Sequence, residues 1–174
     1  IYVVSEDQSR YNKHFDNLDP LESVHKDFTI EYVNVNQKTI DKLPEISGRL
    51  PKEINLKLFL SDLLPIDDGK VLYLDSDTII KDDISKLINK DMSSHTIAGA
   101  QDVSPESIVG LGVSLNRRYI NAGVLLINLE RWRDQNVKKK CFEFIKTHNP
   151  NRNEQTALNA ILHQIDSIDV VSLR

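Results

Sequence analysis

The chain has 174 residues and a mass of 19.9 kDa, which suits one domain or one lobe of a larger one. Hydrophobic residues make up 40% and charged residues 28%, so a disordered tail and a collagen-like repeat are excluded. A net charge of −4 argues against a nucleic-acid-binding surface, and no apolar run approaches the ~20 residues of a transmembrane helix. The one cysteine, Cys141, cannot form an internal disulfide and fits a reducing compartment.

The hydrophobic pattern predicts an α/β chain, in which apolar strands alternate with helices. Strands are expected at 1–4, 28–35, 70–74, 96–100, 123–129 and 165–173. Helices are expected after Ser5, over Leu56–Leu64, at Ile84–Ile88, from Val137 to Asn149 and around Ala157–Leu162. The long segment Val103–Arg118 has little periodicity and is predicted to be a functional loop. Both ends of the chain fall in or beside strands, so the domain is expected to be cut at both ends.

The most informative segment is a buried strand, Val71–Leu74, that runs into Asp75 and Asp77. In an extended backbone, residues i and i+2 point to the same side, so these carboxylates are expected to converge at the carboxyl end of the strand. Two carboxylates at close range repel unless a cation neutralises them, and a hard divalent ion shared with phosphate oxygens is the natural partner. Ligands of open α/β sheets bind at this edge.

Two other interpretations of this segment stay open. Asp-x-Asp is common by chance, and the segment could be a strand that ends in a polar turn. It also resembles the nucleophile segment of haloacid-dehalogenase phosphatases, in which Asp75 would be the nucleophile. That motif requires Thr or Val two residues after the second aspartate, where Ile79 stands here, and it normally opens the domain.

Three further segments occur in a distinctive order: Lys57–Pro65, Asn-Ala-Gly-Val-Leu-Leu-Ile-Asn-Leu at 121–129, and Asn-Glu-Gln-Thr-Ala-Leu-Asn at 153–159. Together with the strand-end Asp-x-Asp, they make the chain resemble the retaining glycosyltransferases of family eight. This is the family of glycogenin and of bacterial lipopolysaccharide galactosyl- and glucosyltransferases. The resemblance extends from Ile1 to Asp169.

The resemblance implies a GT-A fold, a Rossmann-like α/β sandwich, present here as a single partial catalytic domain over residues 1–174. It implies metal-dependent transfer of a hexose from a UDP-sugar to a glycan or lipopolysaccharide acceptor, with retention at the anomeric carbon. The implied cofactor is Mn²⁺, with Mg²⁺ as the alternative. Retention by double displacement and retention by same-face attack both stay open.

The resemblance also implies roles for individual residues. Asp75 and Asp77 are expected to hold the metal. Glu154 and Gln155 are expected beside the anomeric carbon as the catalytic pair, with Glu154 where the family has Asp. Donor binding is implied for Lys57 (where the family usually has Arg), Asp75, Ser76, Asp102, Asn121 and Ala122.

Structural roles are the alternatives for these residues. Lys57 could be a solvated helix flank, Asn121 could begin a buried strand, and Asp102 could end one. Glu154 could belong to a helix-capping pair with Asn151. Outside the motifs, Trp132 and Cys141 are expected to pack in the core, and the five histidines have no metal-ligand spacing.

The expected partners are the sugar donor and the acceptor, with no nucleic acid and no transmembrane segment. The family's first strand and its late metal-binding histidine are expected to lie outside the chain, which predicts self-association along an exposed sheet edge. The expected location is cytoplasmic, or peripheral at the inner membrane through segments outside the chain. The alternative function is an inactive glycosyltransferase-like fragment that serves as a binding or structural module.

Overall fold

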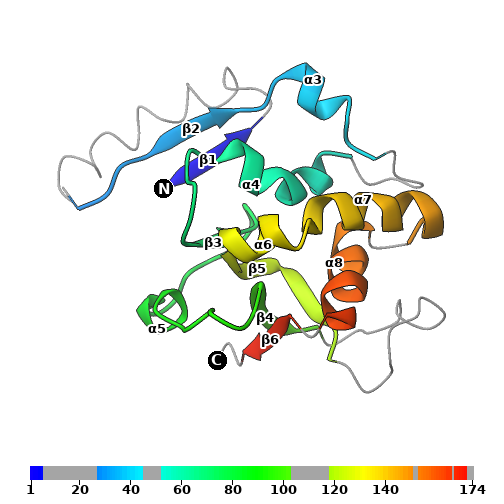
Figure 1. The fold of residues 1–174 in the computed structure, drawn as a ribbon. Helices are drawn as coiled ribbons and strands as arrows, with labels where there is room; N and C mark the ends of the chain where they lie inside the picture. Colours follow the sequence, from blue (N-terminus) through cyan, green and yellow to red (C-terminus); the bar gives the residue numbers. More distant parts are fainter. Residues whose placement is uncertain (6–26, 45–51, 103–117, 151–152, 166, 172–174) are drawn as a thin grey trace.

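The computed structural model describes residues 1–5, 27–44, 52–102, 118–150, 153–165 and 167–171 (Figure 1). The strands are β1 Tyr2–Ser5, β2 Glu31–Asn34, β3 Lys70–Leu74, β4 Ile97–Gln101, β5 Ile120–Asn128 and β6 Ile168–Val171. The helices are α3 Gln37–Ile40, the 3₁₀ helix η1 Lys52–Phe59, α4 Leu60–Leu63, α5 Ser85–Ile88, α6 Leu129–Asp134, α7 Val137–His148 and α8 Asn153–Gln164. The helix predicted after Ser5 and nearly all of the predicted loop Val103–Arg118 lie outside these residues.

The main sheet has four strands in the order β3-β5-β4-β6, and β1 and β2 form a separate parallel pair. Strand β5 runs antiparallel to both β3 and β4, whereas β4 and β6 are parallel. The start of β5 therefore lies at the carboxyl end of β3. Leu74 pairs with Val124, and the Asp75 amide donates to the Gly123 carbonyl at 2.8 Å. This pairing brings two of the sequence motifs side by side.

The four-stranded sheet is covered on both faces, and β5 supplies both cores because its side chains alternate. Leu125 and Ile127 belong to the large core that η1, α6, α7 and α8 also enter. Leu126, on the other face, belongs to a smaller cluster with Met92, and Leu87 of α5 packs against this cluster. Figure 1 shows α5 to the left of the sheet, α6 and α7 above it and α8 to its right. The molecule is thus the α/β sandwich that the sequence predicts.

The predicted elements are present where they can be checked, with shifts at their ends. Strand β3 has the predicted bounds, β2 is shorter than predicted, and β5 begins at Ile120, three residues before the predicted start. The single helix predicted over Leu56–Leu64 is wrong in type: it is a 3₁₀ helix up to Phe59 and one turn of α-helix beyond it. Helix α7 ends as predicted, because Asn149 adopts a left-handed conformation with φ 45° and Pro150 follows.

Two short helices, α3 and α6, go beyond the predicted elements. Each begins after an asparagine whose side chain accepts a hydrogen bond from a backbone amide three residues later. Asn36 caps the Thr39 amide at 3.0 Å, and Asn128 caps the Arg131 amide at 3.1 Å. Such caps satisfy amides that have no partner within the helix, so a single turn can persist.

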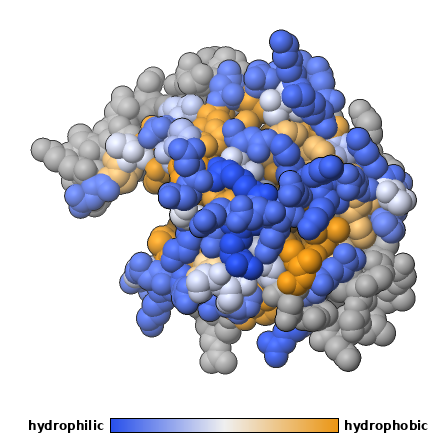
Figure 2. Space-filling view, viewed as in Figure 1, coloured by the Kyte–Doolittle hydropathy of each residue, from blue (hydrophilic) through white to orange (hydrophobic). Residues whose placement is uncertain are grey.

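The surface and core agree with an ordinary globular chain. Trp132 and Cys141 are buried in the core, as predicted. Figure 2 shows hydrophilic side chains over most of the described surface on the face in view, with smaller apolar areas between them. Within the ranges that the structure describes, no helix combines the length and the apolar composition that crossing a bilayer requires.

Candidate active site

Lys57, on η1, lies at the centre of the site. Its Nζ is 3.3 Å from Asp75 Oδ1, 3.2 Å from Glu154 Oε1 and 3.1 Å from the Ala122 carbonyl oxygen. An ammonium has three N–H donors, so these three acceptors fill its capacity. The side chain is 5% exposed, and the alternative of a solvated helix flank is therefore wrong.

Tyr73 also belongs to the site, although no motif in the sequence singles it out. It stands two residues before Asp75 on β3, and its hydroxyl donates to Asp75 Oδ1 at 2.5 Å. The Lys57 ammonium lies 5.0 Å from the centre of its ring. Burial, the hydrogen bond to Asp75 and the nearby carboxylates raise the pKa of Tyr73 far above its usual value. The phenol therefore remains a hydrogen-bond donor at neutral pH.

The two predicted metal ligands lie on a turn at the carboxyl end of β3. The Asp75 carbonyl accepts a hydrogen bond from the Thr78 amide at 3.0 Å, so the extended backbone expected across Asp75–Asp77 is wrong. The Asp75 side chain is 39% exposed, and Ser76 and Asp77 are exposed. Asp77 is nevertheless close enough to act electrostatically on the Tyr73 phenol.

Glu154 lies in the first turn of α8 and is buried against Lys57. Its pKa is raised because burial disfavours the charged carboxylate, although the Lys57 ammonium and its own backbone amide oppose this effect. The capping interpretation depends on Asn151, which lies outside the described residues. The described contact of the side chain is with Lys57.

Gln155 joins two other predicted residues to α8. Its Oε1 accepts from the Ala122 amide at 3.0 Å, and its Nε2 donates to Asp102 Oδ2 at 3.0 Å. Asp102 directly follows β4, as the strand-exit interpretation expects, and its amide donates to the Tyr119 carbonyl at 2.9 Å. Gln155, Ala122 and Asp102 are all buried, so these two hydrogen bonds lie in the interior of the protein.

The Asn159 side chain connects α8 to β5 by hydrogen bonds. It is fully buried one helical turn after Gln155, and its Nδ2 donates to the carbonyls of Ile120 and Gln155 at 3.0 and 2.8 Å. Its Oδ1 accepts from the Ile120 amide at 2.8 Å. The only sign of this role in the sequence is the i, i+4 spacing of Gln155 and Asn159 in the 153–159 motif.

The 121–123 segment forms the wall beside Asp75. Asn121 is exposed within β5, and its Oδ1 accepts from the Gly123 amide at 2.8 Å. A Cβ at Gly123 would lie 3.0 Å from both Asn121 Oδ1 and Asp75 Oδ2. Glycine at position 123 thus allows these two side chains to approach the backbone closely.

The charges of the cluster fit a divalent cation. The single ammonium of Lys57 lies among the carboxyl groups of Asp75, Asp77 and Glu154, so acidic groups outnumber the basic one. In the described part of the chain, all hydrogen bonds to the Asp75 carboxylate end on Oδ1, which leaves Oδ2 for a ligand. Carboxylate oxygens suit Mn²⁺ or Mg²⁺, which keep further positions for water and phosphate. Across the described ranges, no group of three or more His, Cys, Asp or Glu side chains could hold a metal ion.

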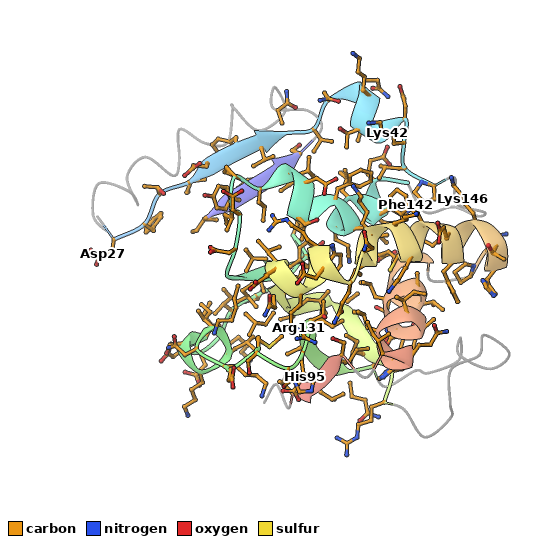
Figure 3. All side chains as sticks on the ribbon, viewed as in Figure 1. Asp27, Lys42, His95, Arg131, Phe142 and Lys146 are labelled. Atoms are coloured by element: carbon orange, nitrogen blue, oxygen red, sulfur yellow. The ribbon has the colours of Figure 1, made fainter. Side chains whose placement is uncertain are left out.

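His95 lies outside the candidate site. It precedes β4, whereas Asp102 follows the same strand, so the two lie at opposite ends of it. Figure 3 shows His95 next to β6, away from η1 and α8.

Comparison with known proteins gives a family-model match to "Glycosyl transferase family 8" over residues 3–168. General stress protein A of Bacillus subtilis is 31% identical over 141 residues, which cover 77% of this chain and 49% of that protein. The glycosyltransferase GlyE of Streptococcus pneumoniae is 34% identical over 119 residues, 66% of this chain and 27% of that protein. The chain thus spans half or less of the length of these relatives.

Two solved structures show the same fold. The galactosyltransferase LgtC, crystallised with donor and acceptor sugar analogues, has a TM-score of 0.73 at 20% identity, covering 99% of this chain and 73% of that one. The bifunctional glycosyltransferase WbbM has a TM-score of 0.77 at 19% identity, covering 98% of this chain and 32% of that one. The predicted GT-A fold is confirmed.

Proposed function

The chain belongs to glycosyl transferase family 8, and on that premise we propose that it transfers a hexose from a UDP-sugar to a glycan or lipopolysaccharide acceptor, with retention. The observation that carries the proposal is the convergence of Lys57, Asp75 and Glu154 at the carboxyl end of β3. This is the edge at which open α/β sheets bind their ligands. The galactosyltransferase named among the similar structures supports a hexose donor.

In this proposal Asp75 and Asp77 hold Mn²⁺, or alternatively Mg²⁺, against the diphosphate of the donor. The cation would supply neutralisation of the charge that develops on the leaving diphosphate. Because the three donors of Lys57 are engaged within the protein, we assign it an electrostatic and positioning role, holding Asp75 and Glu154 in one arrangement. The exposed side chains Ser76 and Asn121 can reach a donor directly.

Glu154 and Gln155 are proposed to flank the anomeric carbon at the amino end of α8. Glu154 would stabilise positive charge on the sugar from the face opposite the diphosphate. Gln155 would act with Asp102 and Ala122, the two residues that it connects, to form the wall of the sugar site. Both double displacement and same-face attack are compatible with this arrangement.

A donor screen tests this function. Free UDP is measured after incubation of the protein with Mn²⁺ and a panel of UDP-hexoses, with an added glycan or lipopolysaccharide acceptor. We expect UDP release for at least one donor, and loss of this release in EDTA and in Asp77→Asn. Asp77 is exposed, so this substitution leaves the fold intact. Release that is unaffected by EDTA and by Asp77→Asn would overturn the proposal.

The two alternative functions give different results in the same assay. An inactive binding or structural module would release no UDP with any donor. A phosphatase would leave the UDP-hexoses intact; with an added phosphomonoester it would transfer the phosphoryl group to Asp75, detectable by mass spectrometry, and release inorganic phosphate when water hydrolyses the acyl phosphate.

A cytoplasmic location and self-association along a sheet edge remain parts of the proposal, and β3 and β6 are the edge strands of the four-stranded sheet.

A further inference from the structure

Tyr73 has no role in the function proposed above, yet it makes the shortest described contact with Asp75. We propose that Tyr73 is a positioning residue for the cation site. Its hydroxyl fixes Oδ1 of Asp75, so that Oδ2 is presented to the cation and the diphosphate. This inference rests on the proposed function, because it concerns the same site.

The geometry of β3 brings the two side chains together. Residues two apart in a strand point to the same face, so Tyr73 lies directly behind Asp75. The phenol donates to Oδ1 at 2.5 Å, and the Lys57 ammonium approaches the same oxygen at 3.3 Å. Oδ2 lies on the other side of the carboxylate, against Gly123 and beside Asn121.

The phenol can supply a rigidity that Asp75 and Lys57 lack. The terminal torsion of an aspartate is broad, so a carboxylate held by one flexible partner samples many orientations. Lys57 has a long flexible stem, whereas the ring of Tyr73 packs against the core cluster and under the ammonium. Partners in the outer shell of a metal site fix its ligands, and their removal typically weakens metal affinity by ~10–100-fold.

The competing explanation is structural. A phenol at this position needs an acceptor in any case, and Asp75 could be no more than that acceptor. The two explanations differ in their effect on cation affinity. A structural role predicts a change in stability alone, whereas a positioning role predicts a change in the affinity for Mn²⁺ and UDP in protein that remains folded.

The test compares Tyr73→Phe with wild type and with Tyr119→Phe by calorimetric titration of Mn²⁺ and UDP. Phe keeps the ring and removes the donor. Tyr119 is the matched control because it is buried and its hydroxyl pairs with Thr156 Oγ1 at 2.9 Å instead of with a carboxylate. We expect ~10–100-fold weaker binding for Tyr73→Phe and unchanged binding for Tyr119→Phe.

Three further arms sharpen the result. Site-specific 4-aminophenylalanine at 73 restores a donor and should restore most of the affinity, whereas 4-fluorophenylalanine fills the space of the phenol without a donor and should not. If Tyr73 acts through Asp75, then Tyr73→Phe should add no further loss on an Asp75→Asn background. In turnover assays, the KM for the donor should rise more than kcat falls.

The outcomes separate this inference from the proposed function. If wild type binds UDP only with Mn²⁺ and the donor-less variants bind equally well, the positioning role is wrong and the proposed function stands. If wild type does not bind UDP with Mn²⁺, the proposed function is overturned and this inference with it. Weak binding in the donor-less variants, rescued by 4-aminophenylalanine, supports both.

Discussion

Lys57 and Glu154 form an ion pair in the interior of the protein, with Nζ and Oε1 3.2 Å apart and the side chains 5% and 4% exposed. The pair joins η1 to the first turn of α8. A buried pair adds little net stability compared with apolar residues, but removal of one partner leaves an uncompensated charge. The charges proposed to act on the donor are thus also part of the packing between these two helices.

Removal of the Lys57 charge is expected to destabilise the fold strongly. Lys57→Met leaves Glu154 buried without a cationic partner, and the expected loss in the free energy of unfolding is about 3–5 kcal/mol. Urea denaturation at neutral pH measures it. The double variant Lys57→Met with Glu154→Gln should recover part of this loss. A loss below about 1 kcal/mol, typical of an exposed pair, would contradict the buried arrangement.

The raised pKa of Glu154 predicts a pH dependence of stability. The folded protein binds this proton more tightly than the unfolded chain, so the contribution is fully present below pH 4.5 and is lost as the pH rises through the folded pKa. Glu154→Gln removes this dependence. Urea denaturation from pH 4 upward should therefore show the variant gaining stability relative to wild type with rising pH. Parallel curves would show that the carboxylate is not desolvated.

The strand that leads into the proposed metal ligands could be predicted from the sequence because its evidence is local. The apolar run before Asp75 predicts a strand over 70–74, and β3 has these bounds in the structure. The family resemblance also identifies Glu154 and Gln155 as neighbours on α8. These predictions need only the neighbouring residues or a known motif.

The contacts between motifs could not be predicted in this way. A lysine in the predicted helix Leu56–Leu64 has the same sequence pattern whether its ammonium is solvated or paired, and the difference depends on where α8 lies. The bond from Gln155 to Asp102 joins residues 53 positions apart. Tyr73 shows the i, i+2 relation to Asp75, but that spacing alone does not distinguish a donor to the carboxylate from a core aromatic residue.

Gly123 should be required for cation binding more than for folding. In Gly123→Ala the new Cβ would lie 3.0 Å from Asp75 Oδ2, so the carboxylate must move. We expect weaker Mn²⁺ binding with a small change in melting temperature. Gly99→Ala is the matched control, because its Cβ would meet Leu125 and Ile120 in the core at 3.0 and 3.1 Å. It should lower stability, whereas equal effects of the two variants on both quantities would contradict this account.

Gln155→Glu should place two carboxylates against each other. The new carboxylate can still accept from Ala122, but it would face Asp102 Oδ2, where the amide now donates at 3.0 Å. We expect lower stability at neutral pH, with a smaller loss near pH 4, where a shared proton restores the hydrogen bond. Gln164→Glu, at the exposed end of the same helix, is the control. Thermal unfolding of both variants at neutral pH and near pH 4 measures the effect. A loss of stability in Gln155→Glu that does not depend on pH would contradict the hydrogen bond from Gln155 to Asp102.

The most direct test of the central claim is a calorimetric titration of the protein with UDP, in Mn²⁺ and in EDTA, for wild type and Asp77→Asn. Asp77 is exposed, so its substitution should change stability by no more than about 0.5 kcal/mol. We predict binding for wild type in Mn²⁺, and none in EDTA or in the variant. Equal UDP affinity in Mn²⁺ and EDTA, or an unchanged affinity in Asp77→Asn, would contradict a metal-dependent donor site at the end of β3.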